Sequence, residues 1–268
     1  MADVQQVAEW LAQADGLLIT AGAGMGIDSG LPDFRGPGGF WSVYPALGRA
    51  RIAFESIANP AAFDQDARLA WGFYGHRLAL YRSTQPHAGF QRLRELGERL
   101  EHGSFVFTSN VDGQFQKAGF SPAGICEVHG SIHHLQCSGP CHESIWSADG
   151  YRPDVDEDAC CERGELPTCP RCGALARPNI LMFGDWSWIE RRTALQHQAL
   201  QQWLAEVERP LCIEIGAGTH IPTVRYFSER QGWRLIRINP GEPEIPNPAT
   251  GLGMALGAVA GLETLFPD

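Results

Sequence analysis

Residues 22 to 36 read GAGMGIDSGLPDFRG and directly follow the apolar run LLITA at residues 17 to 21. The run is typical of a buried parallel strand. After such a strand, glycines at Gly22 and Gly24 let the backbone turn tightly beside Ala23 and approach a pyrophosphate, which amides of the next helix can bind. This order predicts a nucleotide site, although the glycines alone also fit an ordinary strand-to-loop turn.

The continuation Pro32-Asp33-Phe34-Arg35 strengthens this interpretation. An acid, an aromatic ring and a guanidinium share one short loop beside the turn. Together Asp33, Phe34 and Arg35 can hold an amide, cover a ring, and pair with a phosphate or a ribose.

Elsewhere the pattern alternates between helix and strand. It predicts helices at 2 to 14, 86 to 102 and 191 to 207, and strands at 17 to 21, 104 to 108, 211 to 215 and 234 to 238. This order predicts an α/β fold with a Rossmann-like, doubly wound parallel sheet, whose ligands bind at the carboxyl ends of the strands.

Two segments interrupt the alternation, and we expect them to form a smaller module inserted into the large domain. Residues 36–84 are rich in aromatic side chains and predict a helical insertion, whereas residues 131–178 are rich in Cys, Pro and Gly and predict a zinc-binding module. The Rossmann-like domain then comprises 1–35, 85–130 and 179–268.

Composition fits a globular enzyme. The chain has 268 residues, 44% of them hydrophobic, and a formal charge of −10, which disfavours nonspecific nucleic-acid binding and tolerates basic, lysine-bearing partners. No apolar run approaches a membrane span, and the start, MADVQQVAEWLAQAD, predicts an amphipathic helix instead of a signal peptide. We therefore expect a cytoplasmic protein, whose oligomeric state the sequence leaves open.

The cysteines predict a structural zinc site. Cys169 and Cys172 form a tight CPRC knuckle, and Cys137 and Cys141 can supply the second pair of a tetrahedral set. Cys160, Cys161, His133, His134 and His142 remain alternative ligands, and a disulfide framework is the competing interpretation.

Polar residues also follow the strand predicted at 104 to 108. Asn110 and Asp112 occupy alternate positions of the turn TSNVDG, so they can face one pocket. An Asx turn or a helix cap explains them equally well.

The segment at 22 to 36, TSNVDG at 108 to 113 and EVHGS at 127 to 131 together resemble the sirtuin family of NAD-dependent protein-lysine deacylases. The resemblance runs from Leu17 to about Leu265. It implies that NAD is consumed as co-substrate, that acyl-lysine proteins or peptides are the partners, and that the products are nicotinamide, O-acyl-ADP-ribose and free lysine.

The same resemblance assigns roles to residues. His129 is the implied catalytic base acting on the ribose hydroxyls, with Asn110 beside it. Asp33, Phe34 and Asp112 lie on the nicotinamide side. The four cysteines Cys137, Cys141, Cys169 and Cys172 are the implied zinc ligands, and the stretch ARPNILMFGD implies substrate contacts from Ile180, Leu181, Phe183 and Gly184.

The adenosine side departs from the family pattern. The run IGAGTH at 215 to 220 replaces the usual Gly-Thr-Ser, and Ser109 stands where Gln usually precedes the Asn. Both changes raise the question of weaker turnover. The remaining implied NAD contacts are Ser109, Gly216, Gly218, Asn239 and Ala258.

Tyr74 and Arg77 lie three residues apart on a predicted helix, so a hydroxyl and a guanidinium can converge on a carboxylate. This Tyr-x-x-Arg resembles the signature of sirtuins that remove succinyl, malonyl or glutaryl groups. The competing interpretation is an amphipathic helix that packs Trp71, Phe73 and Tyr74 and leaves Arg77 in solvent.

Two other functions remain open at this point. One is an NAD glycohydrolase or ADP-ribosyltransferase on the same fold. The other is a non-catalytic NAD-binding or interaction module.

Overall fold

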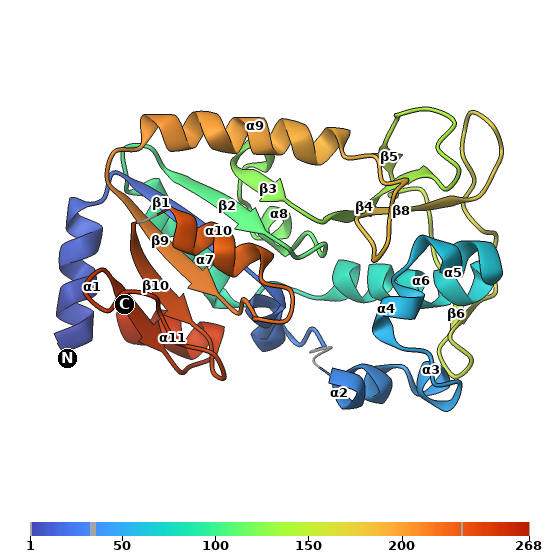
Figure 1. Ribbon diagram of the computed structural model, residues 1–268, viewed down its shortest axis with the longest axis horizontal. Helices are drawn as coiled ribbons and strands as arrows, with labels where there is room; N and C mark the ends of the chain where they lie inside the picture. The colour runs from blue at the N-terminus through green and yellow to red at the C-terminus, as the bar shows by residue number, and fades with distance from the viewer. Residues whose placement is uncertain (1, 33–35, 232, 268) are drawn as a thin grey trace.

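The computed structural model describes residues 2–32, 36–231 and 233–267, and its main feature is a six-stranded parallel sheet (Figure 1). The strand order is β11-β10-β9-β1-β2-β3, and every neighbouring pair is parallel. The strands are β1 (Gly16–Ala21), β2 (Ser104–Thr108), β3 (Ile125–Glu127), β9 (Pro210–Ile215), β10 (Arg234–Ile238) and β11 (Gly251–Met254). Because the chain runs one way from β1 to β3 and the other way from β9 to β11, the order reverses between β1 and β9, which is where such sheets bind ligands.

Strand β1 is the centre of the sheet, and all six of its residues are buried. Ile19 lies in register with Val106 of β2 on one side and Ile213 of β9 on the other. A strand with neighbours on both edges and helices on both faces must be apolar throughout, which explains the continuous LLITA run.

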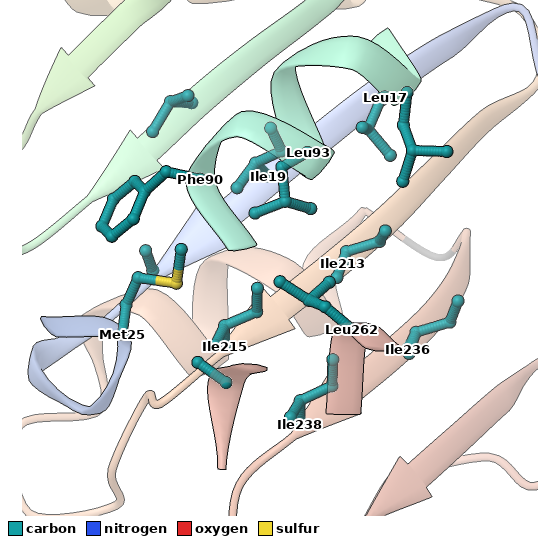
Figure 2. Packing of buried hydrophobic residues seen from close by; sticks show 14 of the residues in the cluster. Leu17, Ile19, Met25, Phe90, Leu93, Ile213, Ile215, Ile236, Ile238 and Leu262 are labelled. Carbon is teal, nitrogen blue, oxygen red and sulfur yellow. The ribbon is translucent and has the colours of Figure 1, made fainter. Parts of the chain in front are cut away.

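Helices cover both faces of the sheet. On one face, Leu17 and Ile19 pack with Phe90 and Leu93 of α7 and with Leu262 of α11 (Figure 2). On the other face, the alternate residue Leu18 belongs to a cluster that includes residues of α9 and α10. The fold prediction is therefore confirmed for the large domain.

The helices follow the predicted alternation. The structure has α1 (Ala2–Gln13), the 3-10 helix η1 (Ala23–Ser29), α2 (Gly36–Val43), α3 (Pro45–Arg49), α4 (Phe54–Ile57), α5 (Pro60–Gln65), α6 (Ala67–Ser83), α7 (Ala88–Glu98), α8 (Gln114–Lys117), the 3-10 helix η2 (Pro122–Gly124), α9 (Arg191–Glu206), α10 (Thr223–Arg230) and α11 (Ala258–Leu265). Helix α7 is shorter than the predicted span of 86 to 102. It begins after His87, whose Nδ1 accepts the Gly89 N–H at 3.0 Å and caps the helix.

The two interrupting segments lie together at the end of the molecule away from α1 and α11 (Figure 1). Residues 36 to 83 form α2 to α6, and the second segment contributes β4 (Gly130–Cys137), β5 (Trp146–Ser147), β6 (Val155–Asp156), β7 (Cys161–Glu162) and β8 (Ala176–Ile180). Side chains from both segments form one hydrophobic cluster, which includes Phe63, Trp71, Leu135 and Cys160. The exact domain boundaries stay a prediction.

Candidate functional site

The first part of the site is a glycine contact at the reversal point of the sheet. The Gly24 N–H donates to the Gly216 carbonyl at 3.0 Å, and Gly216 has a φ of 63°. A Cβ on Gly22 would lie 2.7 Å from the Gly216 oxygen, and a Cβ on Gly216 would lie 2.4 Å from the Gly24 backbone. Three predicted cofactor residues therefore meet here, and the close backbone approach requires glycine at Gly22 and Gly216.

After Gly22 the chain enters η1, a short 3-10 helix that begins at Ala23. The helix expected after the turn is thus tighter and shorter than a typical Rossmann α-helix. Asp33, Phe34 and Arg35 lie outside the described residues, so the nicotinamide-side roles of Asp33 and Phe34 and the cofactor contact of Arg35 stay predictions.

The end of β2 is tied to this glycine turn. The Asn110 side-chain amide donates to the Gly22 carbonyl at 2.9 Å, and the Ser109 N–H donates to the Ala21 carbonyl at 3.1 Å. Asn110 therefore bridges two loops and does not serve as a helix cap. This hydrogen bond brings the end of β2 next to the end of β1, at the edge of the sheet where the sequence predicts the ligand site.

Asp112 behaves differently. Its Oδ1 accepts the Gln114 N–H, two residues on, at 2.9 Å, and Gly113 is the N-cap of α8, so the Asx-turn interpretation fits this residue. The carboxyl is buried, and burial raises its pKa from 3.8 to about 6, while the Gln114 N–H and Arg77 oppose the shift and Glu127 adds to it. A carboxyl with such a pKa changes its charge at a pH close to neutral.

His129 lies in the connection between β3 and β4. Its carbonyl accepts the Leu181 N–H at 2.9 Å. Burial lowers the pKa of its imidazole below the ordinary 6.5, and the nearby Ser109 backbone opposes this shift. The ring is therefore neutral at neutral pH, the state in which it can accept a proton.

A buried ion pair that the sequence analysis missed holds the β3 end. Arg192 of α9 pairs with the carboxylate of Glu127, two residues before His129. The Thr193 hydroxyl donates to the Glu127 carbonyl at 3.0 Å, and Gln196 accepts the Glu127 N–H at 3.1 Å. The only signal in the sequence was a lone acid at the end of an apolar strand, and its partner lies 65 positions later.

The predicted substrate stretch follows β8. Leu181 is 38% exposed, whereas Ile180 is buried in the hydrophobic cluster that the two interrupting segments share. Phe183 donates its N–H to the Ala58 carbonyl at 2.9 Å, and Gly184 has a φ of 62°. Of the four predicted residues, Ile180 thus serves the core, while Leu181 and Gly184 reach the surface.

Tyr74 and Arg77 lie on α6, and both side chains are buried. The Arg77 guanidinium carbon lies 5.9 Å from the centroid of the Tyr74 ring, so the two side chains converge. The competing interpretation correctly packs Trp71, Phe73 and Tyr74, but Arg77 is only 8% exposed and is not in solvent.

Asn239, which is predicted to contact the adenosine half of NAD, is fully buried at the end of β10. Its Nδ2 donates to the Ala217 carbonyl at 2.8 Å, and its Oδ1 accepts the Gly241 and Glu242 N–H groups. It therefore shapes the loop that carries Gly216 and Gly218. Ala258 opens α11 and is buried in the main core.

Glu242 is a further residue that no sequence pattern indicates. Its carboxylate accepts the Thr219 N–H at 3.0 Å and pairs with Arg225 at 3.4 Å. The altered run at 215 to 220 is thus held by an acid from the next loop. His220 projects from this run, 88% exposed and 3.9 Å from the Glu55 carboxylate.

The four predicted zinc ligands form one cluster. The sulfur atoms of Cys137, Cys141, Cys169 and Cys172 all lie within 4.8 Å of one another, and no cysteine of the chain is in a disulfide. Four thiols at this spacing fit tetrahedral zinc. Among the described residues this is the one such group of candidate ligands, so the alternatives are not required, although His142 Nε2 lies 3.4 Å from the Cys169 sulfur.

Comparison with known proteins gives the family. The model of the Sir2 family matches residues 22–213. A Thermococcus kodakarensis protein named NAD-dependent protein deacylase is 31% identical over 87% of this chain and 82% of its own, and NAD-dependent protein deacylase 1 of Pseudomonas aeruginosa is 32% identical over 88% of each. A solved Sir2 homologue in complex with NAD has a TM-score of 0.71 at 24% identity, covering 97% of this chain and 91% of that one.

The chain belongs to the Sir2 family. This confirms the sirtuin resemblance and the expectation of an enzyme of that family. No helix in the described ranges is both long and apolar enough to cross a membrane.

Proposed function

We propose that this protein is an NAD-dependent protein-lysine deacylase that prefers succinyl- or malonyl-lysine. One observation carries the proposal. The Gly22–Gly216 contact, Asn110 and His129 gather at one edge of the sheet, and the Leu181 stretch is bonded directly to His129. The name of the relatives, NAD-dependent protein deacylase, supports the same activity.

The residues fit NAD. The glycine turn lets backbone amides approach a pyrophosphate, and the half-buried side chain of Asn110 is bonded to this turn. When bound, NAD supplies the ribose that accepts the acyl group and nicotinamide as the leaving group. Asn110 orients the ribose side, and Asp112, Asp33 and Phe34 bind the nicotinamide side.

His129 acts as the base in this proposal. A neutral imidazole takes a proton from a ribose hydroxyl, and the fixed backbone at Leu181 keeps the acyl-lysine next to the ring. Zinc at the four cysteines holds the zinc-binding segment together and takes no part in the chemistry.

The acyl preference rests on Arg77. Arg77 is a buried guanidinium, and the carboxylate of a succinyl or malonyl group is a charge-matched acceptor for it. Tyr74 stands beside it on the same helix. The methyl group of acetyl-lysine has neither a charge nor a hydrogen-bond acceptor for this guanidinium.

The experiment is mass spectrometry of products from NAD and peptides of one sequence carrying acetyl-, malonyl-, succinyl- or glutaryl-lysine. We expect free lysine, nicotinamide and O-acyl-ADP-ribose, with faster turnover of the acidic acyl groups. The unmodified peptide is the control. Nicotinamide release with that control would favour the glycohydrolase or ADP-ribosyltransferase alternative, and NAD binding without any product would favour the non-catalytic one.

A further inference from the structure

Helix α6 carries a third polar residue on the face of Tyr74 and Arg77. Tyr81 follows Arg77 by four positions, so the three side chains form a row at i, i+3 and i+7. Tyr81 is 6% exposed. No part of the Tyr-x-x-Arg pattern includes it.

Tyr81 contacts the guanidinium directly. Its hydroxyl oxygen accepts hydrogen bonds from Arg77 Nε at 3.0 Å and from Arg77 Nη2 at 2.7 Å. The guanidinium carbon also lies 5.4 Å from the Tyr81 ring centroid and 5.2 Å from that of Phe73. Two bonds to one oxygen fix the plane of the guanidinium, which a packing contact alone would not do.

The row connects two parts of the proposed site. At one end, Tyr74 lies in the electrostatic field of Asp185, which directly follows the predicted substrate stretch. At the other end, Tyr81 lies in the field of Asp112, and its carbonyl accepts the Gln114 side chain at 3.2 Å. Gln114 thereby links the Tyr81 end of the row to Asp112, whose Oδ1 accepts the Gln114 N–H at 2.9 Å.

We propose that Tyr81 is a positioning residue for acyl selectivity, which orients the Arg77 guanidinium toward an acidic acyl group. This inference rests on the acyl preference proposed above. A phenol suits the task because it orients a guanidinium without cancelling its charge, whereas a carboxylate in the same place would neutralise it. Burial raises the pKa of Tyr81, so the hydroxyl stays neutral.

The test compares Tyr81→Phe with the wild type on succinyl- and acetyl-lysine peptides of one sequence at saturating NAD. Tyr81→Phe keeps the ring and deletes the hydroxyl. We expect the ratio of succinyl to acetyl kcat/KM to fall roughly tenfold, mainly through a higher KM for the succinyl peptide. Tyr151→Phe is the matched control, because its hydroxyl donates to Glu162 at 2.7 Å in the zinc-binding segment.

A double-mutant cycle with Arg77→Met separates positioning from general support. If Tyr81 acts through Arg77, Tyr81→Phe changes the ratio no further in the Arg77→Met background. Arg77→Lys adds a test that does not depend on the folding of Tyr81→Phe. It keeps the charge and removes the planar fork, and we expect it to lower the same ratio.

Three results would overturn the inference. Equal losses on both peptides would mean that Tyr81 supports the fold alone, and an unchanged ratio in Tyr81→Phe or Arg77→Lys would mean that orientation of the guanidinium is irrelevant. In both cases a wild type that prefers succinyl-lysine would leave the proposed function standing. A wild type without that preference would remove the acyl proposal and this inference together.

Discussion

The Leu181 N–H donates a 2.9 Å hydrogen bond to the carbonyl of His129, and this contact joins the candidate base to the predicted substrate stretch. The two residues lie on opposite sides of the zinc-binding segment in the sequence. Strands β4 and β8, which flank the contact, pair antiparallel from Gly130 with Ile180 to Cys137 with Ala176. Cys137, the first residue of the four-cysteine cluster, lies at the end of β4 away from His129. A metal bound there can hold the two strands in register at a distance from the candidate base.

Replacing His129 tests the assignment of the base. His129→Ala should bind NAD normally and lose ~10²- to 10⁴-fold in deacylation rate, because the glycine turn is untouched and the proton acceptor is gone. NAD affinity by calorimetry and product formation by mass spectrometry measure the two effects. His197→Ala, an exposed histidine on α9, is the control. Near-normal turnover of His129→Ala would refute the role.

The pH dependence should follow the same imidazole. Only the neutral ring can accept a proton, and burial lowers its pKa below 6.5, so activity should persist to more acidic pH than an exposed histidine allows. We expect the acid limb of kcat/KM to fall below pH 6.5, measured on the preferred acyl peptide. An acid limb above that value would contradict the neutral, buried state of His129.

Asp112 should make stability depend on pH. Its pKa rises from 3.8 in the unfolded chain to about 6 in the fold. The folded state therefore holds a proton that the unfolded state has lost, so stability falls as pH rises from about 4 to about 6 and stays reduced above it. Asp112→Asn keeps an oxygen that can accept the Gln114 N–H and removes the charge.

The stability gain of Asp112→Asn should then be larger at pH 7 than at pH 4 by up to about 3 kcal/mol. Urea unfolding at both pH values measures it. Asp149→Asn, at an exposed acid, is the control and should show no such difference. An equal effect of Asp112→Asn at both pH values would show that the carboxyl is not desolvated.

The cysteine cluster should bind zinc and stabilise the protein. Cys169→Ala removes one of four ligands, so we expect lost metal and a Tm lower by about 5 °C or more. Metal analysis and thermal unfolding are the measurements, and a chelator should lower the wild-type Tm in the same way. Cys161→Ala lies outside the cluster and serves as the control. Full zinc content in Cys169→Ala would mean that another residue completes the site.

Arg77 should determine acyl preference. Arg77→Met keeps a long apolar stem and deletes charge-assisted hydrogen bonds worth ~1.5–3 kcal/mol, so succinyl-lysine kcat/KM should fall roughly ten- to a hundredfold relative to acetyl-lysine. Arg82→Met is the matched control on the same helix, since Arg82 bonds to the Ala148 and Tyr151 carbonyls. Equal losses of kcat/KM on both substrates would mean that Arg77 supports the fold and does not select the acyl group.

The sequence alone determined the large domain and the order of its motifs. Local hydrophobic patterning placed β1, β2, β9 and β10 within one residue of their observed bounds, because these strands are mostly apolar even where a buried charge such as Glu214 or Arg237 interrupts the run. The short strands β3 and β11 were not predicted, since three or four residues carry too little pattern. The spacing of the cysteines likewise predicts the cluster of four thiols that the structure contains.

Only the tertiary structure decided what the polar side chains of the site contact. Asn110 and Asp112 have the same local pattern, yet one bonds to Gly22 and the other forms an Asx turn with Gln114. Asn239 and Glu242 hold the loop at 215 to 220, and Arg192 reaches Glu127 across 65 positions. Each partner lies on an element that packs against its neighbour only in the folded chain. Spacing along the sequence restricts which residues can share a face, but the packing of helices on the sheet decides which polar groups come within hydrogen-bonding distance.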